Sequence, residues 1–136
     1  MRVGVIIINN TIKYEICCSF GILRVIWDDG SFKGNASDSG ICQFGLTNKL
    51  NEREKIMADK AYRFAKLSCV VPSSTPWKWQ TQDEKIFTTN LYRARQSVER
   101  LIKRVKNFNC ISQRWRFSLE LHQKCVQVVT KLVNLY

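Results

Sequence analysis

The clearest structural signal in the chain is an apolar stripe in its second half. The stripe recurs every three or four residues, at Phe87, Leu91, Ala94, Val98, Leu101 and Val105. This spacing places the six side chains on one face of an α-helix, which must pack against another element. Thr81 and Glu84 fit a capping box, so we expect the helix to begin there. A second helix is predicted from Ser118 to the end of the chain, with an apolar face formed by Leu121, Cys125, Val128, Leu132 and Leu135.

The first half of the chain favours strands. Residues 12–18 and 22–27 are rich in β-branched and aromatic side chains, and the segment between them predicts a hairpin. Turn formers over 28–38 indicate that the chain then leaves the sheet, and a short helix is expected within 39–50. Short buried strands are expected at 55–58 and 67–71, before Pro72 and Pro76 break regular structure. This order predicts an α/β domain with a mixed sheet flanked by helices, strand-rich over residues 1–71 and helical over residues 80–136.

The composition favours one globular domain with an anionic partner. The 22 Lys and Arg residues outnumber the 11 Asp and Glu residues, which gives a net charge of +11. Nucleic acid is the leading candidate partner, and the alternative is a basic piece of a larger, better balanced protein. Residues 3–8 form an apolar run too short to cross a bilayer, so no membrane partner is expected. The six cysteines include no CxxC pair, which favours reduced thiols in an intracellular protein.

Two acids are candidate metal ligands. Asp59 follows a predicted core strand, where ligands gather in open α/β sheets, and the alternative is a turn or capping residue. Glu99 lies at the margin of the apolar stripe, where it could face inward toward a sheet edge. The alternative for Glu99 is a pair of exposed salt bridges with Arg95 and Lys103. If the two carboxylates converge, they suit Mg²⁺ or Mn²⁺, which prefer oxygen ligands.

The helix that contains Glu99 is strongly basic. Its cations are Arg93, Arg95, Arg100, Lys103, Arg104 and Lys106. Because lysine and arginine contact phosphate oxygens, a basic helix beside an acidic pair suits nucleic-acid chemistry better than small-molecule hydrolysis. In such chemistry two metal ions activate the attacking oxygen and stabilise the leaving oxygen, which usually requires a further bridging carboxylate.

Several short blocks give the chain a family resemblance. They are KYE at 13–15, GNASD at 34–38, EKIMADKAY at 54–62, and RQSVER at 95–100 followed by RVKNF at 104–108. In this order the blocks resemble the DDE superfamily endonucleases related to Harbinger transposases, over nearly the whole chain from about residue 11 onward. The ADKAY and RQSVER blocks are the specific part of the resemblance.

The resemblance implies a ribonuclease H-like fold in which Asp59 matches the second catalytic aspartate and Glu99 the closing glutamate, both as metal ligands. Asp38 matches a loop aspartate that we interpret as structural, with the next helix to cap. DNA is the implied partner, with another transposase subunit or an accessory DNA-binding protein, and the implied location is the nucleus. The residues expected to contact DNA are Lys60, Tyr62, Arg95, Arg100, Lys103, Arg104 and Lys106.

The chain departs from the family at the first catalytic aspartate. The family places that residue on an opening strand upstream of residues 13–15, and residues 1–10 contain no acid. Asp28 and Asp29 lie too far along the chain to be good substitutes. We therefore expect an N-terminally truncated domain whose opening strand is missing, and the family's N-terminal DNA-binding helices are missing as well.

Three functions are compatible with these patterns. The first is a divalent-metal-dependent DNA endonuclease or strand transferase, and the second is an inactive transposase remnant that still binds metal or DNA. The third is a basic nucleic-acid-binding module that needs no metal. Among the remaining residues, His122 is expected to be packed or on a helix surface rather than catalytic. Trp77 and Trp79 are expected to anchor their loop, with base stacking as the alternative.

Overall fold

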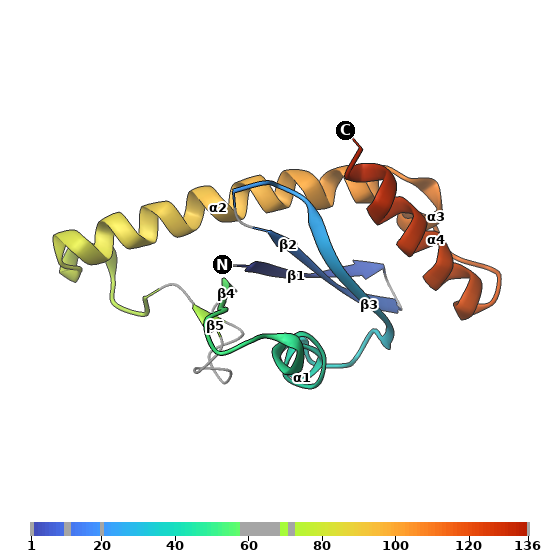
Figure 1. Ribbon diagram of the computed structural model, residues 1–136, viewed down its shortest axis with the longest axis horizontal. Coiled ribbons are helices and arrows are strands. Elements are labelled where there is room, and N and C mark those ends of the chain that lie inside the picture. The colour runs from blue at the N-terminus through green and yellow to red at the C-terminus, as the bar shows by residue number, and fades with distance from the viewer. Residues whose placement is uncertain (1, 10–11, 20, 58–68, 71–72, 136) are drawn as a thin grey trace.

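The computed structural model describes residues 2–9, 12–19, 21–57, 69–70 and 73–135. Its centre is a mixed five-stranded sheet in the order β3-β2-β1-β4-β5 (Figure 1). The strands are β1 (Arg2–Asn9), β2 (Ile12–Ser19), β3 (Val25–Lys33), β4 (Ile56–Met57) and β5 (Cys69–Val70). The first three strands are antiparallel to one another in sequence order, whereas β4 runs parallel to β1 and β5 parallel to β4. The predicted mixed sheet with helices is confirmed.

Strand β1 corrects the expectation that an opening strand is missing. It pairs antiparallel with β2 on one side and parallel with β4 on the other, where Arg2 lies opposite Ile56 and Val3 opposite Met57. A position between two partners suits the sequence of β1, RVGVIIIN, because β-branched residues favour such strands. An opening strand is therefore present, but it contains no acidic residue.

The predicted hairpin exists, but its second strand lies further along the chain. β3 begins at Val25 rather than Ile22, and it continues through Asp28, Asp29 and Gly30, which were expected to form a turn. The ladder continues because β2 has partners for β3 as far as its first residue, Ile12. Gly30 permits this course with a φ of 137°, and a Cβ there would lie 2.8 Å from the Tyr14 ring. Gly30 therefore allows β3 to continue close to β2 where a turn was predicted.

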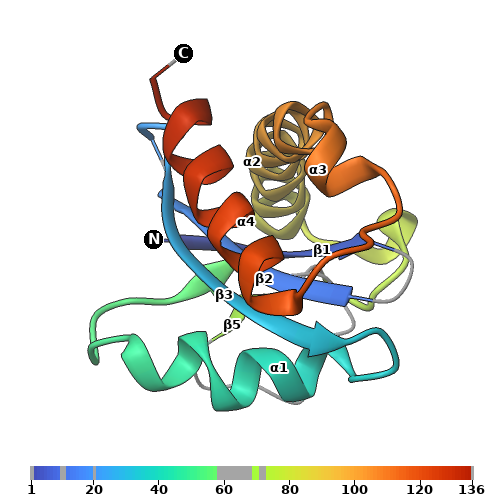
Figure 2. The same cartoon turned by 90° about the vertical axis from the view of Figure 1, so that its right-hand side faces the viewer.

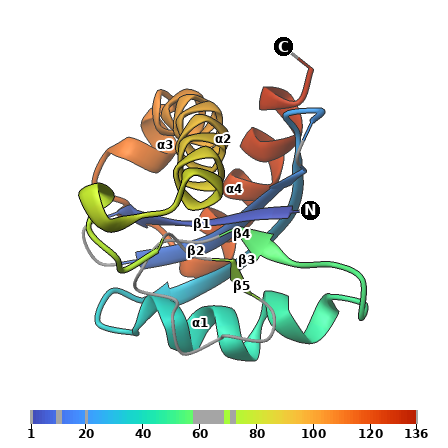
Figure 3. The same ribbon diagram turned by 90° about the vertical axis from the view of Figure 1, so that its left-hand side faces the viewer.

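Alternate side chains of β2 face two different layers of helices. Tyr14, Ile16 and Cys18 belong to the larger apolar core, and Cys17 belongs to a smaller one. This period of two is expected for a strand covered on both faces, since neighbouring side chains point in opposite directions. Helices α2 (Gln82–Lys106), α3 (Asn109–Ser112) and α4 (Leu119–Val133) cover one face, and α1 (Asp38–Phe44) covers the other (Figures 2 and 3).

Helix α2 confirms the strongest sequence prediction. Thr81 is its N-cap, and the capping box is complete, with the Thr81 amide donating to Glu84 at 2.7 Å and the Glu84 amide donating to Thr81 at 3.3 Å. Most of the predicted stripe is buried, but Phe87 in the second turn is 42% exposed. In Figure 1 this end of α2 extends past the strands, so a residue there has less of the sheet to pack against.

Helix α4 begins where predicted, with Ser118 as its N-cap, but it buries a different face from the predicted one. The buried residues are His122, Val126, Val129, Thr130 and Val133. The predicted Leu121, Val128 and Leu132 are 45%, 55% and 37% exposed, so that stripe was wrong by one residue. Both sets have helical spacing, and polar contacts select between them. Thr130 donates to Asp28 at 3.0 Å, and Asn134 exchanges two 2.8 Å hydrogen bonds with the backbone of Val25.

The smaller core lies between the sheet and α1. Its buried members are Cys17, Cys42, Leu46 and Ile56, which join β2, α1, the 3₁₀ turn η1 (Leu46–Lys49) and β4. The helix expected within 39–50 and the buried strand at 55–58 are therefore both present, the strand with two residues. A further 3₁₀ turn, η3 (Trp77–Trp79), precedes α2.

Five cysteines are thiols that form no disulfide bond: Cys17, Cys18, Cys42, Cys110 and Cys125. Burial raises the pKa of Cys18 to about 12, so this thiol keeps its proton. The expectation of reduced cysteines holds for these five. None of the helices in the described ranges is both long enough and apolar enough to cross a membrane.

Candidate functional site

The site predicted from the sequence combines residues after β4 with residues on α2. Asp59, Lys60 and Tyr62 lie outside the residues that the structure describes. The described half of the site is therefore α2, with Glu99 and the cations around it.

Glu99 faces solvent rather than the sheet. Its side chain is 66% exposed, so of the two alternatives the structure shows the exposed one rather than the inward orientation. Its Oε1 lies 3.9 Å from an Arg95 guanidinium nitrogen, which is too long for a hydrogen bond. Within the described ranges no ion pair joins Glu99 to Lys103, although both are exposed on the same helix. A long and exposed ion pair contributes little to stability, so the carboxylate can bind a cation at small cost.

The cations of α2 form an exposed basic face next to Glu99. Arg100, Lys103, Arg104 and Lys106 are all solvent-exposed, and Arg95 is partly covered. At a rise of about 1.5 Å per residue, the span from Arg95 to Lys106 is about 17 Å, or roughly five base pairs of duplex DNA. Exposed lysine and arginine side chains at this spacing can contact successive phosphates along one strand.

The described residues do not assemble a metal centre. Among them, no three His, Cys, Asp or Glu side chains lie close enough together to hold an ion. Glu99 is a suitable donor for a hard cation, but one carboxylate does not make a binding site. Asp59, the other predicted ligand, lies outside the described residues, so its pairing with Glu99 stays a prediction.

Asp28 and Asp29 do not replace the family's first aspartate. Both lie on β3, which is separated from β4 by β2 and β1. Three steps between strands amount to about 14 Å, whereas paired metal ions are about 4 Å apart. Both carboxylates also accept hydrogen bonds where they lie on β3. Asp28 accepts from the Thr130 hydroxyl at 3.0 Å, and Asp29 accepts from the Gly30 amide at 2.9 Å.

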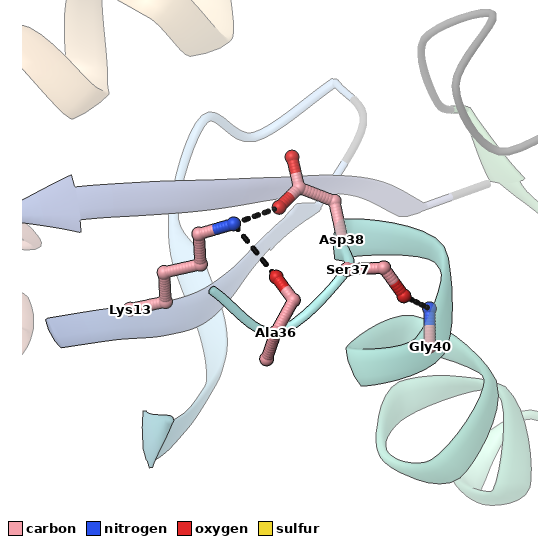
Figure 4. A network of polar contacts seen from close by, with 5 residues as sticks. All are labelled: Lys13, Ala36, Ser37, Asp38 and Gly40. Atoms are coloured by element: carbon pink, nitrogen blue, oxygen red, sulfur yellow. Dashed lines mark hydrogen bonds and ion pairs between the residues drawn. The ribbon is translucent and has the colours of Figure 1, made fainter. Parts of the chain in front are cut away.

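Asp38 has the structural role predicted for it, although it is not the cap. The N-cap of α1 is Ser37, whose hydroxyl accepts from the Gly40 amide at 3.1 Å (Figure 4). Asp38 instead accepts from Lys13 Nζ at 2.8 Å, and Lys13 also donates to the Ala36 carbonyl at 2.7 Å. The lysine of the KYE block therefore ties β2 to the aspartate of the GNASD block, so two of the blocks are in direct contact.

Glu15, in the same KYE block, is a buried carboxyl on the α1 side of the sheet. It is 2% exposed, and its Oε2 accepts from the Leu46 amide at 3.1 Å. Burial raises the pKa of Glu15, and the hydrogen bond from Leu46 opposes part of that rise. Because Glu15 lies in the α1 layer and α2 covers the opposite face of the sheet, Glu15 does not share a site with Glu99.

His122 is packed, as expected for a lone histidine on a helix. It has no exposed surface, and its Nε2 donates to the Cys110 carbonyl at 2.8 Å. Its Nδ1 is 2.6 Å from the Tyr14 hydroxyl, which donates to it when the ring is neutral. Burial raises the pKa of Tyr14 to about 12, with the neighbouring Cys125 as a second cause, so the hydroxyl keeps the proton it donates.

Trp77 and Trp79 do not anchor their loop, which corrects the sequence prediction. Their side chains are 55% and 70% exposed in η3, ahead of α2. Lys78 lies over the Trp79 ring and Lys85 over the Trp77 ring. The sequence did contain a signal for this arrangement, because lysines surround both indoles and the Thr81 capping box fixes the start of the helix without them.

A family model described as DDE superfamily endonuclease matches residues 8–135. Comparisons with curated proteins and with solved structures gave no match. The matched residues include the block after β4 with Asp59 and the block on α2 with Glu99, whereas most of β1 precedes them.

Proposed function

The chain belongs to the DDE superfamily endonucleases, and on that premise we propose that it is a divalent-metal-dependent DNA endonuclease domain with Asp59 and Glu99 as metal ligands. The observation that supports this most is Glu99 itself. It is an exposed carboxylate on a basic helix within the matched residues, and its one ion pair with a described residue, Arg95, is long. A solvent-facing carboxylate surrounded by cations is suited to a metal ion and a phosphate together.

The fold proposed for this domain is ribonuclease H-like, as a single unit over residues 1–136. The mixed sheet supports it, because β1 lies between an antiparallel meander and two parallel strands. We place the chain near the Harbinger transposases on the strength of its ADKAY and RQSVER blocks. A DNA substrate makes the nucleus the proposed location.

DNA is proposed to lie along the basic face of α2. Arg100, Lys103, Arg104 and Lys106 would contact phosphates, with Arg95 next to Glu99 at one end. We add Lys60 and Tyr62 from the segment that follows β4. Such contacts position a duplex without reading its sequence, so we expect affinity that depends steeply on salt and little on base composition.

Bound Mg²⁺ or Mn²⁺ would supply an activated oxygen nucleophile and stabilise the charge on the phosphate. Asp59 and Glu99 would hold the ion, and the cations of α2 would orient the phosphate and balance its charge. Arg95 is a positioning residue in this scheme, because its guanidinium lies 3.9 Å from the Glu99 carboxylate and would face a phosphate bound beside the metal.

A second function is favoured by the sequence of β1. This strand has no acid, and Asp28 and Asp29, the residues weighed as substitutes, are engaged on the edge strand β3. A domain with two of three carboxylates would bind metal and DNA but stabilise cleavage poorly. In this form the domain would need another transposase subunit or an accessory DNA-binding protein as its partner.

Plasmid nicking distinguishes the two functions. Supercoiled DNA is incubated with the chain and Mg²⁺ or Mn²⁺, and the wild type is compared with Glu99→Gln and Asp59→Asn. Glu120→Gln is the matched control, because Glu120 is an exposed helix glutamate with an i,i+4 partner, Lys124, at 2.9 Å.

Nicking that both site variants abolish and the control retains would support the endonuclease. Metal-dependent DNA binding without nicking, weakened by both site variants, would support the binding function. DNA affinity that changes neither with metal nor in either site variant would refute both proposals, and would indicate a basic nucleic-acid-binding module instead.

A further inference from the structure

Two indoles at the start of α2 are exposed on a rigid support. Trp77 and Trp79 are 55% and 70% exposed, although large aromatic side chains are usually buried in a domain. Their backbone is fixed without them, since the Trp79 amide donates to the Pro76 carbonyl at 2.9 Å. The Gln80 side chain donates to the Thr75 carbonyl at 2.8 Å and accepts from Thr88 at 3.3 Å. Hydrogen bonds thus hold the segment while both rings remain available to a ligand.

Each indole has a cation against it. Lys78 Nζ lies 5.2 Å from the centre of the Trp79 ring, and Lys85 Nζ lies 5.7 Å from the centre of the Trp77 ring. Both distances fall within the range of cation–π contacts. The nearby acids, Asp83 and Glu84, are in the first turn of α2, and Glu84 is engaged in the capping box. Each ring therefore has a lysine ammonium group beside it that can bind an anionic backbone.

A concave surface continues from the Trp77 ring along α2. Trp77, Lys85, Asn90 and Arg93 are among the residues that line a cavity of about 470 Å³. Asn90 and Arg93 also line a second cavity of about 470 Å³ between α2 and the β2–β3 connection. The described residues lining both cavities include no acid. An uncharged or basic track of this size suits a flat ring with a phosphate attached.

We propose that Trp77 and Trp79 form a stacking platform for unpaired DNA bases, with Lys78, Lys85 and Arg93 on the phosphates. Bases in a duplex are stacked on each other and cannot use an exposed indole, whereas single-stranded nucleotides present their faces to it. The platform is separate from Glu99 and would hold single-stranded DNA flanking a cleavage position. It rests on the proposed function only in that the partner is DNA.

Intrinsic tryptophan fluorescence with a short oligothymidylate and EDTA tests the platform without any metal chemistry. Stacking quenches indole emission, and a duplex of equal length is the comparison ligand. Trp77→Ala and Trp79→Ala should each weaken single-strand binding by roughly 5- to 150-fold in Kd, since stacking on an aromatic contributes about 1–3 kcal/mol per base. Duplex affinity should change less than about threefold in the same variants, because phosphate contacts dominate it.

Phe117→Ala is the matched control. Phe117 is 71% exposed and next to Arg116, so it tests whether any exposed aromatic beside a cation would serve. Trp77→Phe and Trp79→Phe should retain part of the affinity, since a phenyl ring still stacks, and circular dichroism checks that each variant is folded. Lys85→Gln should reduce the dependence of log Kd on log salt by about 0.7, as expected for one single-strand phosphate.

The outcomes separate this inference from the nuclease proposal. If the alanine variants bind oligothymidylate like the wild type, the platform is refuted even when Glu99→Gln abolishes nicking. If oligothymidylate quenches the wild type and binding is lost in the alanine variants, the platform stands even when no nicking is found. Equal losses of duplex and single-strand affinity, equal losses in Phe117→Ala, tighter binding of an oligoribonucleotide, or capture by anionic phospholipid vesicles instead of DNA would each overturn it.

Discussion

Replacement of His122 by phenylalanine tests whether α4 is held in place by the polar link from Tyr14 to Cys110. The substitution removes the 2.6 Å contact with the Tyr14 hydroxyl and the 2.8 Å contact with the Cys110 carbonyl. His122 is fully buried and Tyr14 is 2% exposed, so water cannot readily replace the lost partner of the hydroxyl. A buried polar group without a partner costs about 1–3 kcal/mol, so the unpaired Tyr14 hydroxyl should reduce the free energy of unfolding by that amount, and the part-buried Cys110 carbonyl should add less.

A double-mutant cycle isolates the tyrosine contact. Tyr14→Phe alone leaves the histidine Nδ1 without its donor and should cost about 1–3 kcal/mol. The double variant lacks both the Tyr14 hydroxyl and the His122 ring nitrogen, so neither is left buried without its partner. Its loss in free energy of unfolding should therefore be smaller than the sum of the two single losses by about 1–3 kcal/mol. Urea unfolding followed by circular dichroism gives all four free energies. Additive losses, with a coupling below about 0.5 kcal/mol, would refute the link.

Three further predictions concern stability. Lys13→Met should cost about 2–3 kcal/mol in urea unfolding, because it removes two hydrogen bonds from a charged donor, whereas no loss would mean that the two blocks are held by other contacts. Because burial raises the pKa of Glu15, its contribution is fully present below the ordinary value of 4.5 and is lost as the pH rises through the folded value. Glu15→Gln should therefore raise the thermal midpoint at pH 7 and make the decrease of that midpoint above pH 4.5 shallower. If the variant has the same pH profile as the wild type, Glu15 is not the source of that decrease. Thr81→Ala should lower the free energy of unfolding by about 1 kcal/mol through the lost cap, measured in the same urea assay, and Thr81→Ser should not.

Helix α2 could be predicted almost completely because its local signals agree. The capping box fixes its first residue, and five of the six stripe residues are buried where the helix crosses the sheet. Phe87 differs because the sequence records helical periodicity but not where the sheet ends. How far the sheet extends along α2 is a tertiary property that helical periodicity alone does not show.

Helix α4 shows why periodicity can select the wrong face. Leu121, Val128 and Leu132 have the same spacing as the set that includes His122 and Val129, and the first set is more apolar. The structure buries the less apolar set, because His122 and Thr130 have polar partners on the sheet, in Tyr14 and Asp28. Such partners lie about a hundred residues away in the sequence, so no local pattern shows them.

The candidate site could be predicted only in part. The cations of α2 are exposed as expected of a basic helix, and the structure adds that Glu99 faces solvent. The sequence placed Glu99 at the margin of the apolar stripe, where a rotation of a few tens of degrees decides between sheet and solvent. For the two tryptophans, the local preference of large aromatics for burial predicted the wrong environment, because the capping box and the Gln80 hydrogen bonds already hold the loop.

The central claim is that Asp59 and Glu99 bind one divalent metal ion, and titration of Mn²⁺ followed by electron paramagnetic resonance tests it most directly. We predict a saturable site that weakens by about tenfold or more in both Asp59→Asn and Glu99→Gln, because loss of even an outer-sphere partner costs 10–100-fold. Glu120→Gln should bind Mn²⁺ like the wild type, since Glu120 lies on α4 rather than α2 and its carboxylate is paired with Lys124 on the same helix. Equal Mn²⁺ affinity in the wild type and both site variants would contradict the claim.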